Sequence, residues 1–113
     1  MVGRSELEAV GSYPDFEVLT RAGAGKADYF CAAGEFAKRW LKARNADRLV
    51  VISVRDPSRF RANRLAVAFG LNGEEPAQAD YLRVGGPRVG QAASVGHSIA
   101  LCDAARASRV LEN

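Results

Sequence analysis

The stretch Arg48-Leu-Val-Val-Ile-Ser-Val-Arg55 has the length and the β-branched composition of a central β-strand whose two faces are largely covered. After a turn signal at Asp56-Pro57 and a basic loop, Arg64-Leu-Ala-Val-Ala-Phe-Gly-Leu71 has the same character. Because a connection of hairpin length joins the two stretches, we predict adjacent antiparallel strands over residues 48–55 and 64–71.

The segment just before Arg48 changes from strand spacing to helical spacing. Apolar side chains recur three and four positions apart with charged side chains between them, and the apolar positions are Ala33, Phe36, Ala37, Trp40 and Leu41. We predict a helix over residues 32–44 that packs on the sheet and buries Phe36 and Trp40. The same two rings could instead line a ligand pocket.

Two interpretations compete for the residues that precede this helix. Residues 15–22 are rich in strand formers, and Gly23-Ala-Gly25 suits a tight turn, so residues 26–31 could return as the second strand of a hairpin. Alternatively the helix begins earlier, with Asp28 as its N-cap and the aromatic pair Tyr29-Phe30 on its apolar stripe. We favour the hairpin.

The rest of the chain completes one domain over residues 15–113, after a short polar lead-in over residues 1–14. A short strand is predicted over residues 80–84, and a helix from about Ile99 to Val110 with Ser98 as its cap. The order is ββαβββα, which is an α+β class. We expect a mainly antiparallel sheet of four to five strands with two helices against one face.

Composition excludes some classes of protein and suggests one kind of surface. Of 113 residues, 48% are hydrophobic and 26% are charged, as in ordinary globular domains, and no run approaches the length of a membrane span. The net charge of +3 is uneven, because residues 38–64 carry nine basic side chains against two carboxylates. A candidate anion-binding patch therefore comprises Lys38, Arg39, Lys42, Arg59, Arg61 and Arg64.

Nucleic acid is the less favoured partner for this patch, because few aromatic side chains stand among its basic residues to stack on bases. We expect Arg59, Arg61 and Arg64 to be exposed, since too few carboxylates are available to pair with them.

Cys31 and Cys102 leave three interpretations open: a disulfide, two buried free thiols, or a nucleophilic Cys31. In the third, the order of Cys31 and a downstream His97 resembles papain-like cysteine hydrolases. CxxC spacing is absent and His97 is the single histidine, so no zinc site is predicted. The glycine-rich stretches match neither nucleotide-binding fingerprint. No cofactor or metal is therefore expected, and an enzyme is the less favoured interpretation.

Three segments, residues 13–20, 29–37 and 95–98, resemble a group of small exported bacterial proteins of unknown function. In that group an aromatic–Cys step precedes a helix and a second Cys lies near the C-terminus. The resemblance implies export and removal of a signal peptide. The first residues of this sequence are themselves not a signal peptide, because they lack its apolar region. Export would favour a Cys31–Cys102 bond, with Cα atoms about 4.4–6.8 Å apart.

We therefore expect a non-enzymatic binding or structural protein that is periplasmic or secreted, and otherwise cytoplasmic. Its partner and its oligomeric state are not specified by any motif, and no membrane span is predicted.

Overall fold

The computed structural model describes residues 7–72 and 86–112 and confirms the predicted α+β class with the order ββαβββα. One antiparallel sheet has the strand order β1-β2-β4-β3-β5, so that β1 and β5 are its edges. The elements are β1 (Ala9–Gly11), β2 (Asp15–Leu19), α1 (Lys26–Trp40), β3 (Arg48–Pro57), β4 (Leu65–Leu71), β5 (Ala92–Ser94) and α2 (Val95–Glu112).

The strand pair at the centre of the sheet is the one that the sequence predicts. β3 and β4 run antiparallel, with Val51 opposite Phe69, and β2 pairs with the other side of β4. Alternate residues of the central strands, among them Phe16 and Val67, are fully or almost fully buried in the main core beneath α1. The prediction that residues 48–55 and 64–71 pair is confirmed.

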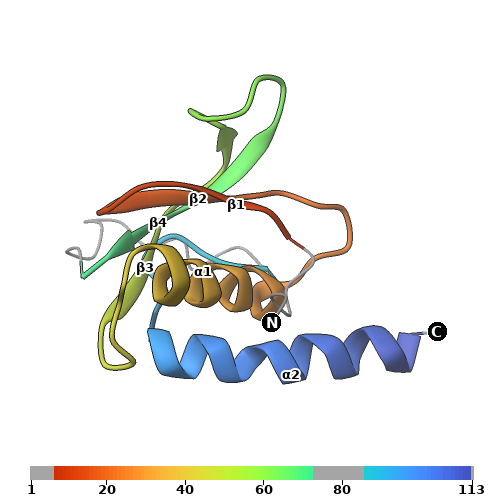
Figure 1. Cartoon of the computed structure of the whole chain (residues 1–113). Helices are drawn as coiled ribbons and strands as arrows, with labels where there is room; N and C mark the ends of the chain where they lie inside the picture. Colours follow the sequence, from red (N-terminus) through yellow and green to blue (C-terminus); the bar gives the residue numbers. More distant parts are fainter. Residues whose placement is uncertain (1–6, 73–85, 113) are drawn as a thin grey trace.

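The two helices cover one face of this sheet in successive layers (Figure 1). α1 lies on the strands, and α2 packs against the outer side of α1. Phe30 of α1 meets the ring of Phe69 edge-on with centroids 5.3 Å apart. On its other side α1 presents Gly34, where a Cβ atom would lie only 2.9 Å from the Cβ of Ser98 in α2. A glycine is therefore needed for the helices to approach this closely.

The opposite face of the sheet carries the loop of the β3–β4 hairpin. β3 shifts register twice against β4 and holds Arg55 at a φ of 56°, which bends the hairpin away from the helices (Figure 1). The loop then contacts β2, where the Ser58 hydroxyl donates to the Glu17 carboxylate over 2.7 Å. Basic side chains of this loop therefore lie on the face of the sheet that α1 does not cover.

The favoured hairpin over residues 15–31 is wrong, because residues 26–31 open the helix instead. The N-cap residue is Gly25, not Asp28. Asp28 stands in the first turn, where its carboxylate accepts the Gly25 backbone N–H over 2.9 Å. The antiparallel partner of β2 at this edge is β1, which lies within the stretch that we expected to be a lead-in. α1 ends at Trp40 rather than at residue 44, since Lys42 adopts a φ of 59°.

The start of the second helix also differs from the prediction. α2 begins at Val95 rather than near Ile99, and Ser94 is the residue whose hydroxyl accepts the His97 backbone N–H, over 3.1 Å. Ser98 instead donates its hydroxyl back to the Ser94 carbonyl over 2.8 Å. The strand predicted over residues 80–84 lies outside the described residues.

Candidate functional site

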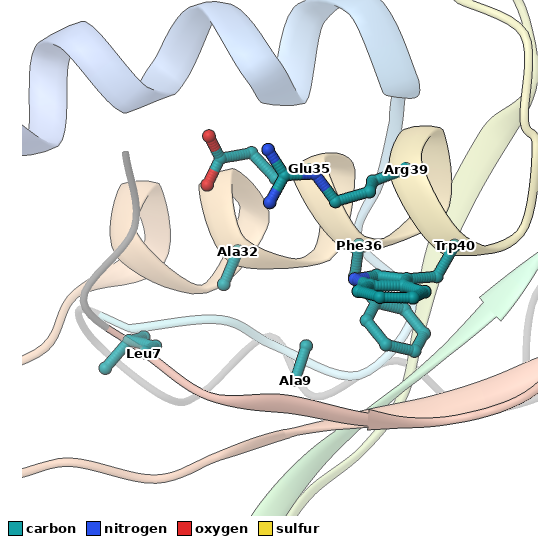
Figure 2. A pocket seen from close by; sticks show the side chains of 7 residues that line it. All are labelled: Leu7, Ala9, Ala32, Glu35, Phe36, Arg39 and Trp40. Carbon is teal, nitrogen blue, oxygen red and sulfur yellow. The ribbon is translucent and has the colours of Figure 1, made fainter. Parts of the chain in front are cut away.

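A groove of about 150 Å³ lies between α1 and the edge strand β1 (Figure 2). Four of its helical residues stand three, four, seven and eight positions after Ala32, so the five form one stripe, while Leu7 and Ala9 are two apart and face the same side. The lining residues are Leu7, Ala9, Ala32, Glu35, Phe36, Arg39 and Trp40.

Trp40 is the exposed large hydrophobic residue of the groove, and the prediction that it is buried is wrong. Its side chain is 67% exposed. Helical periodicity correctly points the indole toward the strands, as Figure 2 shows. It stands in the last turn of α1, however, where the groove-facing residue of the neighbouring edge strand is Ala9, whose methyl group is too small to cover it.

The floor of the groove is fixed by aromatic packing. Phe36 is half-buried, and its ring stacks on Phe16 of β2 with centroids 4.9 Å apart. Figure 2 shows Glu35 and Arg39 one turn apart on α1, with their charged ends turned toward each other. The groove therefore offers a ligand an aromatic surface that is already in place, with one acidic and one basic group at its rim.

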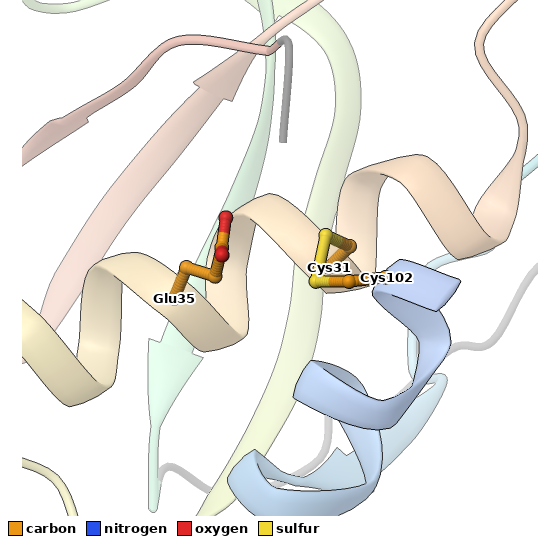
Figure 3. A group of neighbouring side chains, drawn as sticks. All are labelled: Cys31, Glu35 and Cys102. Atoms are coloured by element: carbon orange, nitrogen blue, oxygen red, sulfur yellow. A yellow bond between two sulfur atoms is a disulfide. The ribbon is translucent and has the colours of Figure 1, made fainter. Parts of the chain in front are cut away.

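A disulfide joins Cys31 of α1 to Cys102 of α2, and the first of the three interpretations is confirmed (Figure 3). The Cα atoms are 4.8 Å apart, within the expected range, and the two residues are 2% and 1% exposed. Cys31 has no thiol in this state, and His97 is an exposed residue in the first turn of α2. The arrangement thus gives little support to a Cys–His nucleophile.

Glu35 is the one further potential metal ligand beside the disulfide within the described part of the chain. One ligand atom each of Glu35, Cys31 and Cys102 lie within 4.8 Å of one another (Figure 3). Both sulfurs are occupied by their mutual bond, whereas a metal ion would take them as thiolates. In the disulfide form, the group is therefore a poor match for metal coordination.

The six residues of the candidate anion-binding patch lie in two groups on opposite sides of the sheet. Lys38, Arg39 and Lys42 stand at the C-terminal end of α1, where the Lys38 ammonium donates to the Asn45 side chain over 2.7 Å. The second group lies on the hairpin loop that contacts the other face, and consists of Arg59, Arg61 and Arg64. The structure therefore does not bring the six side chains into one patch.

The hairpin arginines are exposed as predicted, but the reason given for their exposure is wrong. The Arg61 guanidinium pairs with Glu8 over 3.0 Å, and the Arg59 guanidinium lies 3.5 Å from Glu17. Glu17 is only 3% exposed and also accepts the Arg59 backbone N–H over 3.1 Å. Strand alternation between Phe16 and Val18 is the signal that could have placed Glu17 on the face opposite the main core.

Comparison of the chain with models of protein families, with curated proteins and with solved structures finds no match. Across the described residues, no helix combines the length and apolar character that crossing a bilayer requires. The groove and the disulfide are therefore the features of the structure that bear on function.

Proposed function

We propose that this protein is an exported, non-enzymatic binding domain that takes its ligand in the groove between α1 and β1. The observation that carries the proposal is the exposed indole of Trp40, which stands beside the fixed ring of Phe36 in a concave site. Tryptophan is costly to leave in water and is enriched where proteins bind partners.

Export is supported by the buried disulfide. Bonds of this kind persist in oxidising compartments and are rare in the cytosol. The bond also ties α1, which provides most of the groove, to α2. A wall held in this way loses little conformational freedom when a ligand binds, and preorganisation of that kind increases affinity.

Trp40 offers a direct test, because it is the single tryptophan of the chain and its fluorescence reports on the groove alone. The oxidised protein would be titrated with three probe classes: pooled random peptides, soluble oligosaccharides and anionic phospholipid vesicles. We expect one class to shift the emission saturably, and calorimetry to show that Trp40→Ala weakens that binding while Ile52→Ala, beside Gly70 on the opposite face, does not. Absence of a saturable shift with all three classes would refute the groove as a binding site.

The location is tested separately, by acid quenching of producing cells followed by alkylation of free thiols. Cys31 and Cys102 should resist alkylation in the periplasmic or secreted fraction. A cytoplasmic pool with both thiols alkylated would contradict export while leaving the groove untouched.

Anion or nucleic-acid binding through the hairpin loop is the alternative proposal, favoured by the three exposed arginines around Phe60. It has less support, since two of those arginines already pair with carboxylates. If duplex DNA binds there, log affinity should fall by roughly 0.9 per log salt for each phosphate neutralised. No binding at about 50 mM salt would remove this alternative.

A further inference from the structure

The outer edge of β1 borders the groove and offers backbone groups for pairing. In the β1–β2 pair Glu8 stands opposite Leu19, whose N–H donates to the Glu8 carbonyl over 2.9 Å. Bonding alternates along an antiparallel pair, so Glu8 and Val10 point their backbone groups at β2. Ala9 therefore directs its backbone groups away from the sheet, toward the side on which a further strand would lie.

We propose that the groove binds an extended peptide, which adds to the outer edge of β1, where no described strand pairs, as a further strand of the sheet. This inference rests on the proposed binding function and names its ligand class. Edge strands flanked by a helix suit this mode, because main-chain hydrogen bonds supply affinity and the helix wall selects side chains. Here β1 supplies the edge and the stripe of α1 that contains Phe36 and Trp40 supplies the wall.

The sequence preferred in the peptide follows from which of its side chains face α1. Alternate residues of a strand project to opposite faces, so every second side chain of the peptide would face α1. The strand would lie about 4.8 Å beyond β1, where Ala9 leaves the space beside the two rings open. A bulky apolar or aromatic residue of the peptide would fill that space against Trp40.

Lys38 and Lys42, at the C-terminal end of α1, favour an acidic neighbour for that apolar residue. Arg39 and Glu35 both line the groove, and their opposite charges offset each other. The Lys38 ammonium meets a neutral amide at Asn45, so this contact leaves its charge in place. An aspartate or glutamate two residues from the apolar side chain would project on the same face of the added strand, toward this basic end.

A second copy of the chain fits this edge less well than a peptide does. If β1 of another copy paired with this edge, Ala9 and Gly11 of that second copy would lie on the same face of its strand. Gly11 has no side chain and the Ala9 methyl group is too small to reach the rings of the groove, while Leu7, on the same side, already lines the groove of its own copy. The shape of the site therefore favours a partner with larger side chains than β1 itself carries.

The probe for the test is a capped eight-residue peptide of alternating threonine and valine, with one phenylalanine and, two positions on, one aspartate. We expect it to shift Trp40 fluorescence saturably in the oxidised protein. A scan that methylates one peptide amide at a time should weaken binding about tenfold at the amide that bonds Ala9 and hardly at all elsewhere. A flat scan, or no binding of the peptide, would overturn strand addition.

Two protein variants examine the edge and the basic end. Ala9→Pro removes the outward N–H while leaving the bonds to β2, and should weaken binding about tenfold with an unchanged circular dichroism spectrum. Lys38→Gln should weaken binding of the aspartate peptide but not of its asparagine analogue, and Arg64→Gln on the opposite face should change neither. If Ala9→Pro does not fold, the methylation scan decides alone.

The outcomes separate this inference from the proposed function. If oligosaccharides or vesicles shift Trp40 and the peptide does not, strand addition is refuted and the groove remains a binding site. If none of the probes shifts Trp40, both proposals fail. A dimer in sedimentation that Trp40→Ala abolishes would assign the groove to a second copy and overturn the peptide.

Discussion

Glu17 is a carboxylate enclosed between the sheet and the hairpin loop, and it holds that loop through several donors. The Ser58 hydroxyl and the Arg59 backbone N–H both donate to it, and the Arg59 guanidinium lies 3.5 Å away. Since removal of the acceptor would leave buried donors without partners, we expect Glu17→Ala to lower the free energy of unfolding by about 2–3 kcal/mol in urea titration.

Glu8 provides the matched control for Glu17, because it also pairs with an arginine of the loop but is half-exposed. Glu8→Ala should lower the free energy of unfolding by about 1 kcal/mol at most, as for other surface ion pairs. Equal effects of the two substitutions would show that Glu17 is no more than a surface partner of the loop.

Asp47, in the turn between α1 and β3, gives the protein an acid-sensitive contact. The Arg44 backbone N–H donates to its carboxylate over 2.8 Å, and this bond, with help from the side chains of Asn72 and Arg44, holds the pKa of Asp47 below its ordinary value of 3.8. The unfolded chain therefore takes up this proton first on acidification. The stabilisation is complete above the unfolded pKa and is lost as pH falls through the lowered folded pKa.

The test compares urea midpoints of the wild type and Asp47→Asn between neutral pH and about pH 2.5, below the ordinary aspartate pKa. The variant should be less stable at neutral pH and should lose less stability on acidification. Parallel pH profiles for the two proteins would contradict a role of Asp47 in the acid response.

The contact between α1 and α2 depends on the absence of a side chain at position 34. Gly34→Ala should improve helix propensity by up to about 1 kcal/mol, yet we expect it to destabilise the protein by about 1–3 kcal/mol. The new Cβ would lie 2.9 Å from the Cβ of Ser98 and 3.2 Å from the backbone of Ile99. Thermal unfolding measures the loss, and adding Ser98→Gly should recover part of it.

If Gly34→Ala instead raises the melting temperature, the helices can separate slightly at no cost and helix propensity dominates. No recovery on adding Ser98→Gly would mean that the clash arises from Ile99 alone.

The elements that the sequence predicts correctly are those with enough residues to show a period. β3 and β4 each carry a long apolar run, whereas β1 and β5 have three residues each, too few for alternation to be recognised. The start of α1 is predicted wrongly because Gly23-Ala-Gly25 is compatible both with a hairpin turn and with the segment before a capped helix.

The candidate site, like the fold, is predictable from the sequence only in part. Phe36 and Trp40 share one helix face, so their spacing alone allows the interpretation that they line a pocket. Leu7 and Ala9 join them only through the pairing of β1 with β2, which no local pattern encodes. The exposure of Trp40 likewise depends on the small residue opposite it.

At the scale of the whole molecule, the Cys31–Cys102 bond closes a loop across a sequence separation of 71 residues. The chain-entropy model assigns such a bond roughly 4 kcal/mol, a large share of the roughly 5–15 kcal/mol that stabilises a domain. We expect a reductant to lower the melting temperature markedly, and Cys31→Ser to reproduce the loss.

The matched control is Cys31→Ser combined with Cys102→Ser, whose melting temperature should not respond to reductant. An unchanged wild-type melting temperature in reductant, with both thiols shown to be free, would contradict the stabilising role of the bond.

The position of β4 between β2 and β3 also determines the order in which the chain can assemble. β3 and β4 are neighbours in sequence and can pair early, but β2 must wait for a strand that is synthesised about fifty residues later, as the pairing of Phe16 with Phe69 shows. α1 is made before either central strand, so its aromatic face has no sheet to pack on at first. A growing chain that ends before β4 therefore exposes the apolar side of β2 and the aromatic face of α1 together, and only completion of β4 covers them.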